Sequence, residues 1–105
     1  MIMIDLQQYR NPNSKILSGR NFGMQVRKKM KLDEIDKTEE QVTIIIPDDI
    51  WSLNSSYFIG VFEKSVHYLG EENFRNKYVF QCSNNYILEN IEQGIEDILY
   101  NLNYS

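Results

Sequence analysis

The chain has few of the residues on which enzymes and metal sites usually depend. Its 105 residues include one cysteine, Cys82, and one histidine, His67. Neither an internal disulfide nor a Cys/His metal cluster can therefore form, and no glycine-rich phosphate loop is present. We interpret His67 as a surface residue and Cys82 as a small buried side chain. We expect no catalytic residue, no metal and no cofactor.

Long apolar runs and an excess of positive charge are also lacking. No stretch approaches the ~20 apolar residues of a membrane span, and the first residues do not resemble a signal peptide. The formal net charge is −4, whereas general nucleic-acid binding needs a basic surface. We therefore expect a cytoplasmic protein that binds neither membranes nor nucleic acids.

The composition is that of one globular domain. Hydrophobic residues make up 42% of the chain and charged residues 25%, as in ordinary folded proteins. A chain of this length usually folds as one unit around one core. We treat residues 1–105 as a single domain.

The apolar periodicity predicts strands and helices in alternation. The expected strands are residues 1–6, 42–46 and 78–82, and the expected helices are residues 18–30, 54–70 and 84–102. This order is typical of the α/β class and predicts a small, mainly parallel or mixed sheet flanked by helices. Residues 32–41 are almost all charged or polar, so we expect them to form a solvated connector.

Particular residues refine this outline. Residues 42–46 are apolar on both faces apart from Thr43, which predicts a central strand covered by helices on both sides. Gly23 lies inside the first helix, where glycine is unfavourable, and this predicts either close packing or a close backbone approach. Ser18 is the expected N-cap of that helix. The last helix has an apolar stripe formed by Ile87, Ile91, Ile95, Leu99 and Leu102.

A small polar cluster, Asn54, Ser55 and Ser56, opens the second predicted helix. Hydroxyl groups beside free backbone N–H groups suit either the binding of a phosphate or the capping of the helix, and both interpretations remain open. Trp51 in the preceding loop could bind a partner or cover one end of the sheet.

Two pairs of like-charged residues are further candidates for binding a ligand. Arg20 and Arg27 are seven residues apart, on nearly the same helix face, and could bind a carboxylate or phosphate. The alternative is that one is solvated and the other is paired with an acid. Asp48 and Asp49 could bind a cation, but such pairs are also common in turns.

The order of several motifs resembles the STAS-like domain family of unknown function, whose relatives include the anti-sigma factor antagonists. The resemblance covers most of the chain, from about Ser18 to Leu99. It implies a small α/β fold and a regulatory, non-enzymatic role in protein–protein interaction. The motifs are Ser18-Gly19-Arg20 with Gly23 and Arg27, the apolar strand, Asn54-Ser55-Ser56-Tyr57-Phe58, and Gly70-Glu71-Glu72-Asn73-Phe74.

The resemblance also implies roles for the residues at the start of the second helix. Asn54-Ser55-Ser56 matches the Asp-Ser-Ser of the antagonists, so Ser55 is the implied phosphoacceptor and Ser56 the second candidate. The implied partner is an ATPase of the histidine-kinase type. Asn54 departs from the family pattern by replacing an acidic residue, and Tyr57 and Phe58 replace a small and an aliphatic residue.

These observations lead to two main functional hypotheses, with a weak enzyme ranked third and last. The first is an interaction module, monomeric or homodimeric, that contacts its protein partner through Trp51, Asn54 and Tyr57. The second is a small anion- or nucleotide-binding domain that uses Arg20, Arg27 and the helix start at Ser55.

Overall fold

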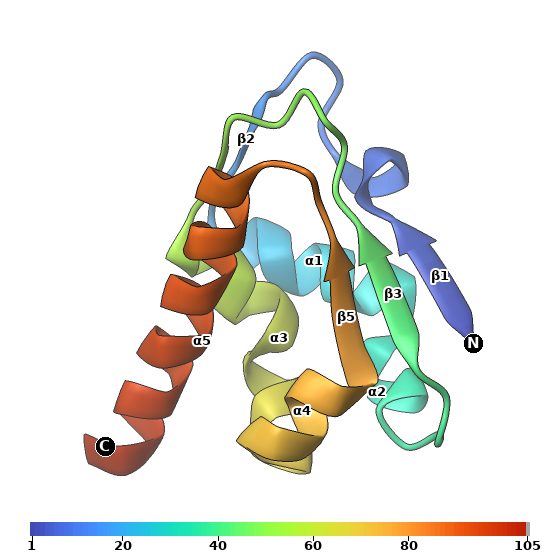
Figure 1. The fold of residues 1–105 in the computed structure, drawn as a ribbon, viewed down its shortest axis with the longest axis vertical. Helices are drawn as coiled ribbons and strands as arrows, with labels where there is room; N and C mark the ends of the chain where they lie inside the picture. The colour runs from blue at the N-terminus through green and yellow to red at the C-terminus, as the bar shows by residue number, and fades with distance from the viewer. Residues whose placement is uncertain (105) are drawn as a thin grey trace.

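Three parallel strands form the central sheet. The computed structural model describes residues 1–104, and the side chains as far as residue 101. The strands β1 (Ile2–Asp5), β3 (Val42–Ile45) and β5 (Tyr78–Gln81) pair in the order β1-β3-β5, with β3 in the middle (Figure 1). The predicted α/β class is confirmed, and of the two predicted alternatives, a mainly parallel or a mixed sheet, the structure has a parallel one.

Helices and a second, smaller sheet accompany this central sheet. The predicted helices are present, and the structure adds short helices and a second, two-stranded sheet formed by the parallel strands β2 and β4. The additional bounds are η1 (Leu6–Tyr9), β2 (Ile16–Leu17), α1 (Arg20–Met30), α2 (Leu32–Ile35), β4 (Ser52–Leu53), α3 (Ser55–Leu69), α4 (Glu71–Lys77) and α5 (Asn85–Tyr104). Within residues 1–104, no helix has both the length and the apolar character needed to cross a membrane.

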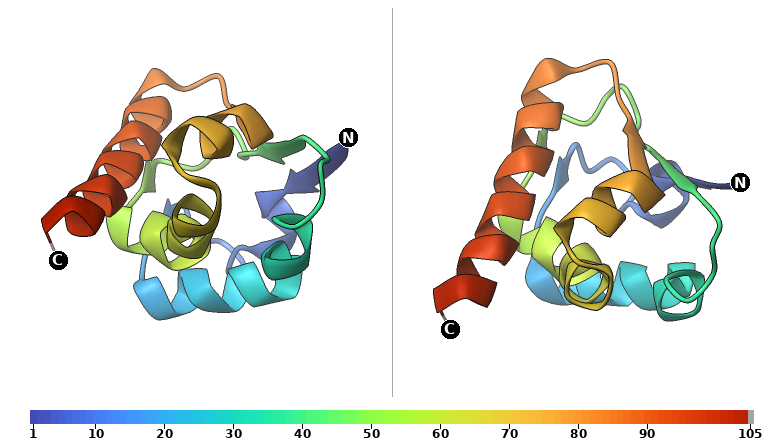
Figure 2. Two further views of the ribbon diagram at one scale, coloured as in Figure 1. Left: turned by 90° about the horizontal axis from the view of Figure 1, so that it is seen from below. Right: turned by 60° about the horizontal axis from the view of Figure 1, so that its bottom comes forward.

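The helices lie on one face of the central sheet only (Figure 2). In register, Ile4, Ile44 and Phe80 form a row that packs into the core. The neighbouring row of Met3, Thr43 and Val79 faces away, and both Met3 and Val79 are exposed. The prediction that helices cover both faces of the middle strand is therefore wrong.

Helices α1 and α3 approach each other closely because each contributes a glycine to the contact. A Cβ atom added to Gly23 would collide with the backbone carbonyl of Tyr57, and one added to Gly60 with the carbonyl of Arg20. The predicted close approach at Gly23 is confirmed. Backbone collisions of this kind cannot be relieved by rotation of a side chain.

The segment 32–41 is not the solvated connector that we predicted. Lys31 adopts a left-handed conformation, with φ 59°, and ends α1, after which α2 begins. Leu32 and Asp36 are both buried. The start of α1 also differs from the prediction, because Gly19 rather than Ser18 is its N-cap. A mostly charged segment therefore contributes two side chains to the interior.

Helix α5 packs through the apolar stripe that the sequence predicts. Ile87, Ile91 and Ile95 are buried, and Leu99 is half-buried. Ile98 is also buried and was not part of the predicted stripe. The side chain of Leu102 lies outside the described residues.

Candidate functional site

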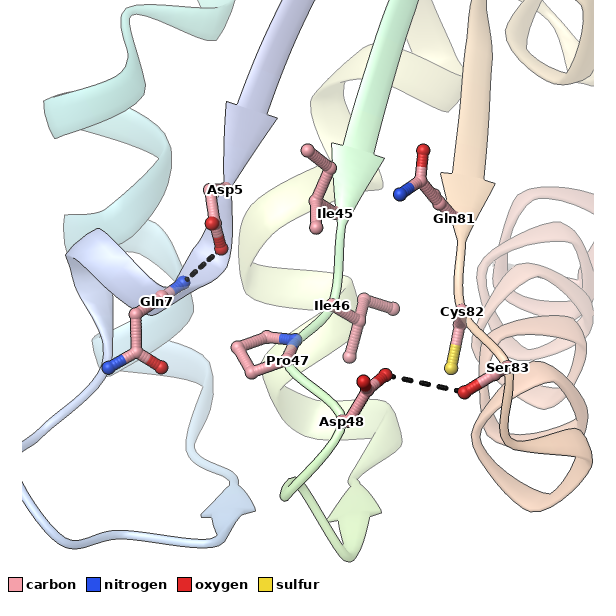
Figure 3. A pocket seen from close by; sticks show the side chains of 9 residues that line it. All are labelled: Asp5, Gln7, Ile45, Ile46, Pro47, Asp48, Gln81, Cys82 and Ser83. Atoms are coloured by element: carbon pink, nitrogen blue, oxygen red, sulfur yellow. Dashed lines mark hydrogen bonds between the residues drawn. The ribbon is translucent and has the colours of Figure 1, made fainter.

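A hollow of about 560 Å³ lies beyond the carboxyl ends of the three central strands (Figure 3). This is the edge at which α/β sheets usually bind ligands. Its polar lining residues are Asp5, Gln7, Asp48, Gln81 and Ser83. Since none of the residues that line it is basic, the hollow is a poor site for an anion.

The two aspartates of the hollow already have partners within the fold. Asp5 Oδ1 accepts a hydrogen bond from the Gln7 amide at 2.9 Å, and Asp48 Oδ1 accepts one from Ser83 Oγ at 3.3 Å. Asp49 instead pairs with Arg10, 2.7 Å away, and this guanidinium lowers the pKa of its carboxyl. Asp48 and Asp49, the two aspartates that could have bound a cation together, therefore contact different partners.

The thiol of Cys82 also lies at the hollow and is half-buried, which differs from the buried position that we expected. Its sulfur accepts a hydrogen bond from the Asn84 amide at 3.4 Å. Among residues 1–101, no group of three or more His, Cys, Asp or Glu side chains is arranged to hold a metal ion. His67 is exposed, as predicted.

The loop that contains Trp51 is held against strand β2. The Trp51 amide donates to the Lys15 carbonyl at 2.7 Å, and the Asn54 amide donates to the Leu17 carbonyl at 2.8 Å. The indole ring remains 64% exposed, with Lys15 Nζ 5.1 Å from its centroid. Of the two predicted roles, the exposed position fits partner binding better than covering the sheet.

The start of α3 is open and polar. Asn54 is the N-cap, but its exposed side chain makes no capping hydrogen bond to the helix. Ser56 is exposed and its Oγ accepts a hydrogen bond from the Gly19 amide at 3.2 Å, whereas Ser55 is half-buried. The Ser56 hydroxyl therefore connects the N-termini of α1 and α3 instead of capping its own helix.

Tyr57 is not part of this surface. Its side chain is only 2% exposed, and its ring lies 5.7 Å from that of Phe22 on α1. Burial raises the pKa of its hydroxyl. The predicted partner contact through Tyr57 is therefore wrong, because this position on α3 faces α1.

The two predicted anion-binding arginines are already paired with acids. Arg27 is 6% exposed and donates to both Asp33 and Asp36, at 2.8 and 2.9 Å. Arg20 is exposed and donates to Glu63 at 2.7 Å. The two guanidinium groups pair with different acids, and that of Arg27 is buried, so the structure gives no support to the anion site predicted from them.

Arg27 instead belongs to a buried polar network that sequence reasoning missed. Asp36 accepts hydrogen bonds from Arg27, from Ser65 Oγ at 2.7 Å and from the Tyr78 hydroxyl. Arg27 Nη1 also donates to Ser65 Oγ and to the Val61 carbonyl, each at 2.8 Å. Burial and the adjacent carboxylate of Asp36 raise the pKa of Tyr78. The network joins α1, α3, β5 and the end of α2.

Comparison with known proteins adds no assignment. No protein-family model, no curated protein and no solved structure matches the chain. The candidate site therefore depends on the geometry alone: Trp51, Asn54 and Ser56 are exposed along one loop and helix start.

Proposed function

We propose that this chain is a regulatory protein-interaction module without catalytic activity, and that it works in the cytoplasm. Its partner contacts the surface formed by Trp51, Asn54 and Ser56, which we call the Trp51 surface. The resemblance to the STAS-like family, described above from the sequence motifs, supports a module of this kind. The observation that carries the proposal is the exposed indole of Trp51 on a loop with a well-bonded backbone.

The backbone of this loop makes Trp51 a suitable anchor. Tryptophan is enriched among the residues that contribute most to binding free energy at interfaces. Binding costs less entropy when the contact residue is already ordered. The Trp51 amide is bonded to the Lys15 carbonyl, and the pairing of β4 with β2 orders the backbone that follows Trp51. The exposed side chain of Asn54 adds hydrogen-bonding groups nearby.

Within this proposal, Ser56 is the first candidate for phosphorylation and Ser55 the second. Ser56 is exposed, whereas Ser55 is half-buried, so a kinase reaches Ser56 more easily. A phosphate adds about −1.5 to −2 charges, and such charge is favourable at a helix N-terminus. The hydrogen bond from the Gly19 amide to Ser56 also places the N-terminus of α1 beside Ser56. The implied kinase is the ATPase of the histidine-kinase type to which the resemblance points.

A pull-down from the native host tests this function, with captured proteins and phosphopeptides identified by mass spectrometry. We expect wild type to recover a kinase-like ATPase, and Trp51→Ala to lose it. Ser56→Asp should weaken the complex, because it mimics the modified state, while Ser56→Ala retains binding without being modified.

The matched control is Ser55→Ala, which should retain both the partner and the phosphate on Ser56. A partner that is captured equally well by Trp51→Ala would contradict the proposed surface. A phosphate found on Ser55 alone would reverse the order of the two serines.

A further inference from the structure

The outer edge of strand β1 is free of any neighbouring element within residues 1–104. β1 pairs only with β3, which occupies the centre of the sheet. At the opposite edge, helix α5 runs beside β5, where Phe80, Leu88 and Ile91 line a common hollow. Figure 1 shows no helix or strand on the outer side of β1. The two edges of the sheet therefore differ.

Alternation along the strand identifies the backbone groups at this edge. The Ile2 amide donates to the Gln41 carbonyl, 2.9 Å away, and so points towards β3. Successive residues of a strand direct their N–H and C=O groups to opposite sides. The N–H and C=O groups of Met3 and Asp5 consequently point away from the sheet.

β1 is short and carries one charged residue, Asp5, but it lacks the other features that usually prevent an edge strand from pairing with another chain. Besides short length and charge, monomeric proteins protect such edges with proline, bulges or a covering element, and lysine is the charge used most. The sequence of β1, Ile-Met-Ile-Asp, contains neither lysine nor proline. Met3, in the middle of the strand, is 58% exposed.

We propose that β1 is a homodimerisation edge, at which the β1 strands of two copies pair antiparallel about a two-fold axis at Met3. In this register Met3 lies opposite Met3 of the second copy, and the two residues exchange both backbone hydrogen bonds. Ile2 lies opposite Ile4 of the second copy. Since residues directly opposite each other point to the same face, core-facing residues meet core-facing residues, and the two sheets become one.

Charge supports a second copy in this orientation. Asp5 is the only charged side chain of β1, and the antiparallel register separates the two copies of it by four residues, or ~14 Å along the strand. That distance exceeds the Debye length of about 8 Å at physiological salt. Parallel pairing would instead place the two carboxylates side by side.

The uncharged strip next to the edge favours the same contact. Met3, Thr43 and Val79 form a row on the open face of the sheet that carries no charge. Each copy carries a net charge of −4, so two copies repel each other least where their facing surfaces are neutral. Pairing joins the two rows into one continuous surface. Because the strand is short, the buried area falls in the range of weak interfaces, and the dimer should depend on concentration.

Sedimentation velocity over a concentration series up to the solubility limit tests this dimer. We expect the mass of wild type to rise from the 12.5 kDa of the monomer towards the dimer value. Met3→Lys should remain monomeric throughout, because it puts two like charges opposite each other at the two-fold axis. Met3→Pro removes the outward N–H and should also remain monomeric.

The matched control is Val79→Lys, which adds the same charge to the same face but on β5. Val79 is 41% exposed, so the new lysine is tolerated, and this variant should dimerise like wild type. Circular dichroism checks that each variant is folded. A monomeric wild type at every concentration overturns the proposal, as does a folded Met3→Lys variant that still dimerises.

Two further readouts locate the contact. Loss of dimerisation in Val79→Lys would place the interface on the open face and overturn pairing through β1. Amide exchange of Met3 should slow as concentration rises, and an unchanged rate in a dimeric sample would also overturn the proposal. Trp51→Ala should leave the dimer intact, so failure of the Trp51 surface and failure of this dimer are distinguishable.

Discussion

Helices α1 and α3 meet in two regions that use the same residue types differently. In the interior, Arg27 and Ser65 join Asp36 in a buried and fully bonded network. At the exposed N-termini, Ser56 makes one hydrogen bond, to the Gly19 amide. The difference shows that burial, more than residue type, decides whether a serine is held in a polar network or remains accessible to solvent.

The largest effect should come from breaking the interior network at its carboxylate. Asp36→Ala leaves Arg27 without its buried partner, and the loss of one member of a buried pair costs about 3–5 kcal/mol of unfolding free energy. Urea unfolding measures this. The control is Asp33→Ala, at the exposed partner of the same guanidinium, which should cost less than about 1 kcal/mol. Equal losses would contradict the distinction between buried and exposed partners.

The two serines give a more direct comparison between the regions. Ser65→Ala removes one of the two hydrogen bonds donated by Arg27 Nη1 and one of those accepted by Asp36 in a buried site, so it should cost about 1–3 kcal/mol. Ser56→Ala removes one exposed contact and should change stability by no more than about 0.5 kcal/mol. Both values come from urea unfolding under identical conditions. A larger loss for Ser56→Ala would show that Ser56 is structural and would weaken its assignment as a phosphoacceptor.

The smallest effect expected from the interior network is a dependence of stability on alkaline pH. The pKa of Tyr78 is raised in the folded state, mainly by burial and then by Asp36. The contribution of Tyr78 to the free energy of unfolding is therefore fully present below the ordinary tyrosine pKa of about 10. It is lost as the pH rises towards the pKa that Tyr78 has in the folded state. The unfolding free energy of wild type should fall between about pH 9 and 11. In Tyr78→Phe we expect this fall to be smaller by about 1 kcal/mol. Identical slopes for the two proteins would contradict this linkage.

The sequence predicts the regular elements of the fold well because periodicity is a local property. The strand at Val42–Ile45, the helix that ends before Gly70 and the close contact at Gly23 all occur as expected. Two short helices, α2 and α4, were not predicted. Each is too short for periodicity to reveal a buried face.

The candidate site is less predictable from the sequence, because exposure depends on what packs against each residue. Tyr57 is adjacent to exposed Ser56 but faces α1 and is buried. Asp36 lies in a charged run that resembles a solvated segment, yet it is the centre of the buried network. The sequence does not show that the roles of Arg27 and Arg20 differ, because that difference depends on the acidic residues with which each one pairs.

The sequence by itself determined the α/β class, the alternation of strands and helices and the polar start of α3. These follow from the spacing of apolar residues and from the preferences of helix starts. Only the tertiary structure decided that one face of the sheet is open, that Arg27 is engaged and that β1 has a free edge. Those features depend on contacts between residues far apart in the chain, which no local pattern specifies.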